Sequence, residues 1–275
     1  MSNDHIHLAL AEGHEDDTRW AYGTGFEDPL HGVDTAVPDG VDTGRLAALC
    51  TALGDDALIS AQRLAEWTTR APELEEEVAL ANIGLDLIGQ ARLLYARAGR
   101  ADGSGRGEDA YAYFRDTEDF RNVRLAELPC GDFAFSVVRL LVLSAWRLAQ
   151  LQALASHPDP VLAAIAAKGV QELTYHRQYA AEWTVRLGDG TEESRRRTTA
   201  ALAETLPYLD ELFTAYDARD EVLAVLRQVT EEAGLSLPAV RPLPGSGRDG
   251  LRTAYLAPLL AELQSVARAD PDATW

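Results

Sequence analysis

The stretch LAALCTALGDDALISAQRLAEWTTRAPELEEEVALANIGLDLIGQARLLYARAG, residues 46–99, decides the fold class. Its apolar residues recur at steps of three and four, the spacing that places side chains on one face of an α-helix. Pro72 and the acids of Glu73–Glu77 favour the start of a second helix, because proline fits the first turn and acids stabilise helix N-termini. The stretch therefore predicts two consecutive helices joined by a short turn.

The same spacing continues through most of the chain. It predicts helices at residues 132–156, 161–187, 191–216, 221–234 and 251–268, with a short helix at 109–116. No stretch shows the two-residue alternation of a β-strand. The first four long helices form two pairs separated by a crossover at residues 100–131, which is the layout of a ferritin-like bundle. We therefore predict an all-α fold: a ferritin-like four-helix bundle with additional C-terminal helices.

Residues 1–45 differ from the remainder of the chain. They contain ten acidic residues against two arginines, and no apolar period holds across them. Low hydrophobicity with high net charge is typical of segments that bury little surface. The sequence thus predicts an acidic, flexible N-terminal tail over residues 1–45 and a helical domain over residues 46–275.

Composition excludes several function classes. The net charge of −19 argues against nucleic acid and anionic membranes as partners, because phosphate binding needs a clustered positive surface. No uninterrupted apolar run reaches the ~18 residues of a membrane span, and the polar N-terminus does not resemble a secretory signal. Cys50 and Cys130 are too few for a disulfide framework, so we expect a cytoplasmic protein. Neither a nucleophile elbow nor a nucleotide-binding glycine motif is present.

A ferritin-like bundle raises the question of a di-iron centre. Such a centre takes one Glu from each of two helices and Glu-x-x-His from each of the other two. The second helix offers Asp86 without an imidazole three residues later. The fourth offers Glu172 and His176, which are four residues apart rather than three. The expected ligand set is therefore incomplete on both helices.

The first and third helices add little to this set. The third contains no Asp or Glu between Phe133 and Ser156, and the residues expected level with Glu172, Val142–Ala145, cannot bind iron. On the first helix, Asp55 or Asp56 is expected level with Asp86. We therefore predict no working metal site. We expect Asp86, Glu172 and His176 to form a polar core network, in which Glu172 and His176 can pair across one helical turn, or to face water or a neighbouring chain.

Four blocks of the sequence resemble one known family. They are Gly54–Gly99, Asp119–Arg139 (DFRNVRLAELPCGDFAFSVVR), Ala163–Ser194 and Leu256–Trp275, and they occur in the family's order. The chain thereby resembles the PaaC family, the structural, non-catalytic, ferritin-like subunits of the phenylacetyl-CoA 1,2-epoxidase, a bacterial multicomponent monooxygenase. The resemblance spans residues 46–275.

The chain departs from the family pattern in three places. These are the long acidic tail, Cys130 where asparagine is expected, and Leu251–Ala254 in place of a His-Thr-Glu element. The last departure puts any role of that element in question for this chain.

The resemblance implies a place in aerobic phenylacetate catabolism. The complex would epoxidise the aromatic ring of phenylacetyl-CoA with O₂ and electrons from NADPH. The di-iron site would lie in a homologous catalytic subunit, and a reductase subunit with flavin and an iron–sulfur cluster would deliver the electrons. This chain would pair with the di-iron subunit and support it, with no catalytic, cofactor-binding or metal-binding residues of its own.

Two other interpretations stay open at this point. One is a self-sufficient di-metal oxidase or ferritin-like metal store with atypical ligands from Asp55, Asp86, Glu172 and His176. The other is an unrelated all-α interaction protein. The absence of an acid on the third helix argues against the metal protein, and the metal content of the purified chain would test it.

Overall fold

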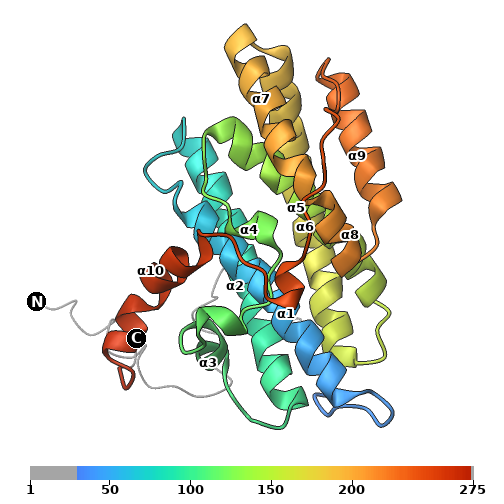
Figure 1. Cartoon of the computed structure of the whole chain (residues 1–275). Coiled ribbons are helices and arrows are strands. Elements are labelled where there is room, and N and C mark those ends of the chain that lie inside the picture. Colours follow the sequence, from blue (N-terminus) through green and yellow to red (C-terminus); the bar gives the residue numbers. More distant parts are fainter. Residues whose placement is uncertain (1–29, 274–275) are drawn as a thin grey trace, which may run out of the picture.

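The computed structural model describes residues 30–273, and no β-strand occurs in that range. Four long helices form the bundle: α1 (Thr43–Ala65), α2 (Leu74–Ala101), α5 (Phe133–Leu154) and α6 (Pro160–Asp189). Figure 1 shows them side by side, with the crossover between α2 and α5 wrapping around the bundle. The predicted all-α, ferritin-like bundle with additional C-terminal helices is confirmed.

Shorter helices complete the chain. They are α3 (Glu108–Ala112), α4 (Arg124–Glu127), α7 (Glu192–Thr205), α8 (Leu209–Ala215), α9 (Arg219–Glu232) and α10 (Leu256–Ala269), with 3₁₀ turns at Thr117–Asp119, Leu206–Tyr208 and Gly247–Asp249. The single helix predicted over residues 191–216 is interrupted between α7 and α8. Pro207 lies in that interruption, and proline cannot donate the backbone hydrogen bond that a continuous helix requires.

Side-chain caps mark where three of the four long helices, α1, α5 and α6, begin. Asp42, Asp132 and Asp159 precede α1, α5 and α6, and each carboxylate accepts a hydrogen bond from the backbone N–H three residues later, at 2.9, 2.9 and 2.8 Å. Such caps satisfy donors that the first turn of a helix leaves without an intrahelical partner. Short polar residues in the sequence thus set the helix boundaries to within a few residues.

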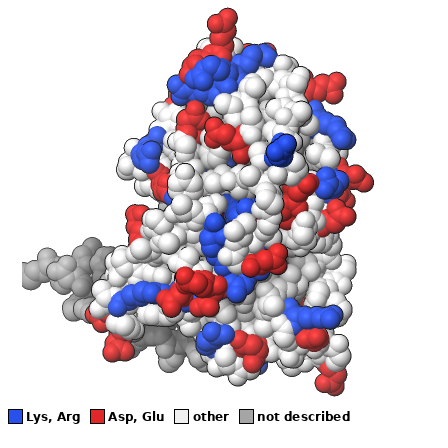
Figure 2. All heavy atoms as spheres, in the orientation of Figure 1, with Lys and Arg blue, Asp and Glu red and all other residues white. Residues whose placement is uncertain are grey.

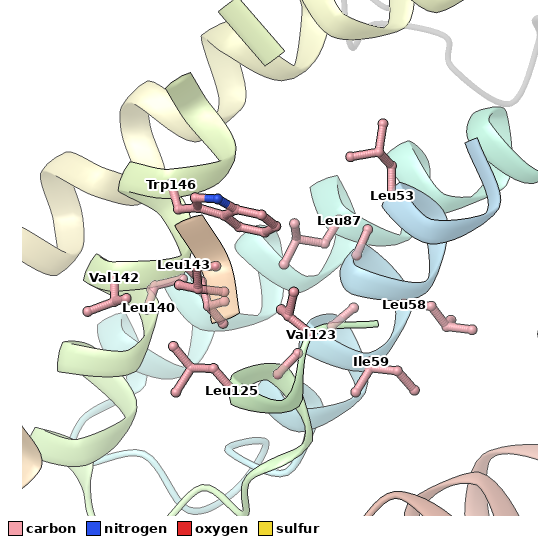
Figure 3. Close-up of a cluster of buried hydrophobic side chains, with 14 of the residues drawn as sticks. Leu53, Leu58, Ile59, Leu87, Val123, Leu125, Leu140, Val142, Leu143 and Trp146 are labelled. Carbon is pink, nitrogen blue, oxygen red and sulfur yellow. The ribbon is translucent and has the colours of Figure 1, made fainter. Parts of the chain in front are cut away.

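The crossover contributes directly to the core. Val123 and Leu125 are fully buried, and Figure 3 shows them between Leu58 and Ile59 of α1 and the α5 side chains. Buried arginines hold the segment in place: Arg63 Nη2 donates to the carbonyl oxygen of Glu127 at 2.6 Å. The crossover is therefore a packed part of the bundle.

The C-terminal segment closes over the crossover. Arg252 donates hydrogen bonds to backbone carbonyls on both segments, and the Thr253 N–H donates to Glu127 Oε2 at 2.6 Å. Burial raises the pKa of Glu127, while Thr253 and Asn122 donate hydrogen bonds that oppose this rise. The segment Leu251–Ala254, which departs from the family pattern, therefore has a structural role in this chain.

Helix α5 is the most apolar element of the described chain. It is long and apolar enough to cross a membrane. Its most apolar 18-residue stretch has a mean hydropathy of 1.4, but 94% of that stretch is buried inside the bundle. No uninterrupted apolar run marks it in the sequence, because Arg139 and Arg147 break the run. The burial identifies α5 as the core helix of the bundle.

The described part of the predicted tail packs against the bundle. Residues 1–29 lie outside the described residues, but Leu30, Val33, Val37 and Val41 contact the core. The Arg97 guanidinium, which pairs with Asp159, also donates to the carbonyl oxygens of residues 35 and 36, at 2.6 and 3.3 Å. The packed chain therefore begins before the predicted boundary at residue 46, because this buried arginine needs more acceptors than one carboxylate supplies.

We expect a chain that starts at residue 42, and so keeps the Asp42 cap of α1, to be less stable than one that starts at residue 30. The shorter chain lacks two acceptors of Arg97 and four apolar contacts, a loss of about 2 kcal/mol in the free energy of unfolding. The melting temperature should fall by about 4–8 °C, measured by circular dichroism. Equal melting temperatures would show that the segment from residue 30 adds no stability, as the predicted boundary at residue 46 implies.

Both cysteines should be unreactive in the folded chain. Cys50 and Cys130 are free and buried, and burial, with Asp159 nearby, raises the pKa of Cys50 to about 12. Because only the thiolate reacts, an aromatic disulfide reagent at about pH 8 should label neither thiol until guanidinium unfolds the chain. Fast labelling of Cys50 without denaturant would show that the packing of α1 against α2 opens readily.

Candidate functional site

The centre of the bundle encloses a cavity of about 20 Å³ between α1, α2, α5 and α6. Its lining includes Ser60, Leu87, Ser144, Arg147, Leu173 and His176. A cavity of this size holds about one water molecule. It lies where a ferritin-like protein would place its metals, at the level where all four long helices converge.

Two buried pairs near the centre of the bundle have a spacing of three residues. Leu87 and Gln90 on α2 are three residues apart, as are Leu173 and His176 on α6; all four are buried, and Leu87, Leu173 and His176 line the cavity. This is the Glu-x-x-His spacing, with leucine in place of both glutamates and glutamine in place of one histidine. Asp86 and Glu172 each precede these positions by one residue, which turns their side chains by about 100° around the helix.

Arg147 of α5 supplies the positive charge at this level. Its Nη2 donates to Gln90 Oε1 at 2.9 Å and its Nη1 donates to the Leu53 carbonyl oxygen at 3.3 Å. Asp56 of α1 lies 3.7 Å from Nη1. Burial lowers the pKa of Arg147, and the Asp56 carboxylate opposes this shift. The guanidinium thus links α1, α2 and α5 near the centre of the bundle.

Three polar atoms around the cavity have no hydrogen-bond partner among the described residues. They are Ser60 Oγ, Arg147 Nε and His176 Nδ1. Buried polar groups are rarely unsatisfied, and a water needs two to four polar partners. We therefore expect the cavity to hold one ordered water that contacts these three groups.

The structure separates Glu172 from His176, which the sequence paired as residues of one network. His176 Nε2 lies 2.9 Å from Asp86 Oδ2 on α2. Glu172 instead accepts a hydrogen bond from Gln90 Nε2 at 2.9 Å and pairs with Lys168. Each residue of the predicted pair therefore contacts α2, His176 through Asp86 and Glu172 through Gln90, and Glu172 also pairs within α6 with Lys168.

Asp55, one of the two residues expected level with Asp86, instead contacts Tyr95 and Arg115. Its Oδ1 accepts a hydrogen bond from Tyr95 Oη at 2.7 Å, and its carboxylate pairs with Arg115. Tyr95 lies nine residues beyond Asp86, about 13 Å along a helix. Asp55 is therefore level with Tyr95 rather than with Asp86.

The connection between α1 and α2 explains this difference. Trp67 is buried there and donates to Ser136 Oγ at 2.9 Å, with its ring edge-on to Phe133 at 5.7 Å. The connection is consequently not a tight turn. A Cβ atom on Gly84 would lie 3.8 Å from Leu64, so the first turns of α2 extend beyond the end of α1. The two helices are shifted along their axes relative to the expected hairpin.

The donor set does not fit a di-iron centre. The cavity lining offers one imidazole, three serine hydroxyls and two guanidinium groups, whereas two iron ions require several carboxylate oxygens. In the part of the chain described, the three acids that converge closely are Glu73, Glu75 and Glu76 at the start of α2. Acids at that position stabilise the helix N-terminus and lie outside the cavity lining.

Comparison with known proteins supplies the family. Residues 34–275 match the family described as "Phenylacetic acid catabolic protein". The chain belongs to this family. It is similar to a subunit of the 1,2-phenylacetyl-CoA epoxidase of Escherichia coli (strain K12), with 39% identity over 247 residues, which is 84% of this chain and 99% of the relative.

Within this member of the phenylacetic acid catabolic family, sequence reasoning missed Gln90 and Arg147. The available signal was two arginines, Arg139 and Arg147, in a helix that is otherwise almost entirely apolar. Charges are rarely buried unless they are paired, so an arginine on a core helix predicts specific acceptors. Arg139 has them in the carbonyl oxygens of Leu128 and Pro129.

Proposed function

We propose that this chain is the structural, non-catalytic subunit of a phenylacetyl-CoA epoxidase. The observation that carries the proposal is Arg147, which occupies the level of the metal site in a bundle similar to one of the epoxidase subunits. The chain would pair with a homologous di-iron catalytic subunit and support it. Di-iron, flavin, iron–sulfur cluster and NADPH would all be bound by other subunits of a cytoplasmic complex.

The contacts around Arg147 explain how the bundle can persist without metal. In di-iron proteins, shared ligands tie the four helices together at their centre. Here one guanidinium reaches α1 through Leu53 and Asp56, and α2 through Gln90. Gln90 in turn reaches Glu172 of α6. A hydrogen-bonded chain of neutral and charged groups therefore performs the structural part of the role of the metals.

Iron binding by the isolated chain tests the proposal. The purified chain should be incubated anaerobically with ferrous iron, desalted and analysed by mass spectrometry for metal content. We expect far less than one iron per chain, because the cavity lacks carboxylate ligands. The catalytic subunit, treated in the same way, is the positive control. About two iron atoms per chain would favour the alternative, a self-sufficient di-metal oxidase or metal store.

A further inference from the structure

Helix α2 is apolar on its outer side as well as its inner side. Leu80, Ile83 and Leu87 point into the core. On the opposite side, four large apolar side chains are exposed: Leu74 by 71%, Val78 by 51%, Leu85 by 64% and Ile88 by 40%. A contiguous apolar stripe on the solvent side of a helix is typical of a surface that another chain covers. The bundle itself covers only one side of α2.

These exposed residues have a regular spacing. Leu74, Val78, Ala81, Leu85 and Ile88, here termed the α2 outer seam, follow one another at steps of four, three, four and three. This is the a/d spacing of a coiled coil, which packs against another helix at a crossing angle of about 20°. The spacing therefore identifies a helix as the covering element.

Gly89 adds an independent observation beside the outer seam. It lies inside α2, where glycine is the poorest helix former after proline. A Cβ atom built on Gly89 would meet nothing within 4 Å, so no contact within the described chain requires glycine there. A helix that approaches α2 closely from outside would require it.

Charge distinguishes a second copy of this chain from a different partner. Glu75 and Glu77 lie beside the α2 outer seam and form no ion pair in the described residues. An antiparallel pair of α2 helices centred on Ala81 would bring these acids near Asp86 of the other copy, and a parallel pair would bring them near each other. Both arrangements place like charges together, and the chain already carries −19.

On the face seen in Figure 2, basic and acidic side chains are interspersed. The charge of that face therefore favours neither a basic nor an acidic partner. Two basic residues of α2 and α6 are already paired, Arg92 with Glu108 and Lys168 with Glu172. The charge left beside the seam is therefore negative.

We propose that the α2 outer seam docks a long helix of a different, homologous subunit, whose own apolar seam is flanked by lysine or arginine. The proposal rests on the proposed function, since it takes the di-iron subunit as the partner. Tyr175, half exposed on α6 next to the His176 that contacts Asp86, extends the apolar surface. Exposed aromatic side chains often become anchors in protein interfaces.

Binding of the purified di-iron subunit to the full chain tests this surface. The variant L85E places a charge in the seam, where Leu85 is 64% exposed. The control V266E places a charge on α10, away from the seam, where Val266 is 59% exposed. We expect L85E to weaken binding by about 100-fold or more and V266E by less than about threefold, measured by titration calorimetry. Both variants should unfold at the same urea concentration as the original chain, because both positions are exposed in the free protein.

Two further variants test the geometry and the charge. G89L should leave the isolated chain as stable or more stable, yet weaken binding by about tenfold, because it fills the space needed for close approach. E77K should weaken binding more strongly at low salt than at high salt.

The outcomes separate the two proposals. No binding of the original chain to the di-iron subunit would contradict the proposed function itself. Binding that L85E and G89L leave unchanged would overturn the α2 outer seam while the proposed function stands. A dimer of this chain that L85E dissociates would assign the seam to a second copy and overturn the choice of partner.

Discussion

Replacement of Asp56 by alanine should destabilise the chain by about 3–5 kcal/mol, because it leaves a buried guanidinium without its counter-charge. The Asp56 carboxylate lies against Arg147, pairs with Arg248 and accepts a hydrogen bond from the Val123 N–H at 2.8 Å. It therefore joins α1 to α5, to the crossover and to the C-terminal segment. Urea unfolding followed by circular dichroism would measure the loss.

Two control variants make this measurement specific. Asp56→Asn keeps an acceptor for the Val123 N–H but removes the charge. Its free energy of unfolding should therefore lie between those of the original chain and Asp56→Ala. Asp210→Ala breaks an exposed pair with Arg219, at 3.2 Å, and should change stability by no more than about 0.5 kcal/mol. A loss below about 1 kcal/mol for Asp56→Ala would mean that solvent, and not Asp56, compensates Arg147.

Replacement of Trp146 by alanine should cost about 3–5 kcal/mol in the free energy of unfolding. Trp146 is fully buried on α5, and its Nε1 donates to the carbonyl oxygen of Tyr216 at 3.0 Å. Figure 3 shows its ring beside Leu87 and above Leu143. The substitution removes a large apolar surface from the core and leaves the Tyr216 carbonyl without this donor.

Trp146→Phe separates the two contributions. Phenylalanine keeps most of the apolar surface but cannot donate, so we expect a loss of about 1–2 kcal/mol from the missing hydrogen bond and a small cavity. Equal losses for both variants would show that the hydrogen bond to Tyr216 dominates. Denaturant titrations with an unchanged slope would confirm that both variants alter the folded state.

The helices could be predicted from sequence because their signals are local. Apolar residues at steps of three and four define α1, α2, α5 and α6, and Asp132, Asp159 and Thr191 cap the helices that follow them. A cap or a period depends on side chains within one or two turns of each other. The lack of acids on α5 is likewise a property of the sequence, and it indicates that the usual iron ligands are missing.

The candidate site itself could be predicted only in part. His176 was identified as a buried polar group, but its partner is Asp86 rather than Glu172. Gln90 and Arg147 were missed, although they connect the helices around the cavity. A search for charged ligands selects Asp86 and Glu172, although the residues that follow them, Leu87 and Leu173, are the ones that face the cavity.

The sequence by itself determined the all-α class, the helix boundaries to within a few residues, and the incomplete iron ligands. Only the tertiary structure decided which residues share a level, that Arg147 lies at the centre, and that Leu74 to Ile88 line the outside of α2. The physical reason is that two helices can slide along each other without changing their local patterns. Their register is fixed by contacts between residues far apart in the chain, such as Trp67 with Ser136.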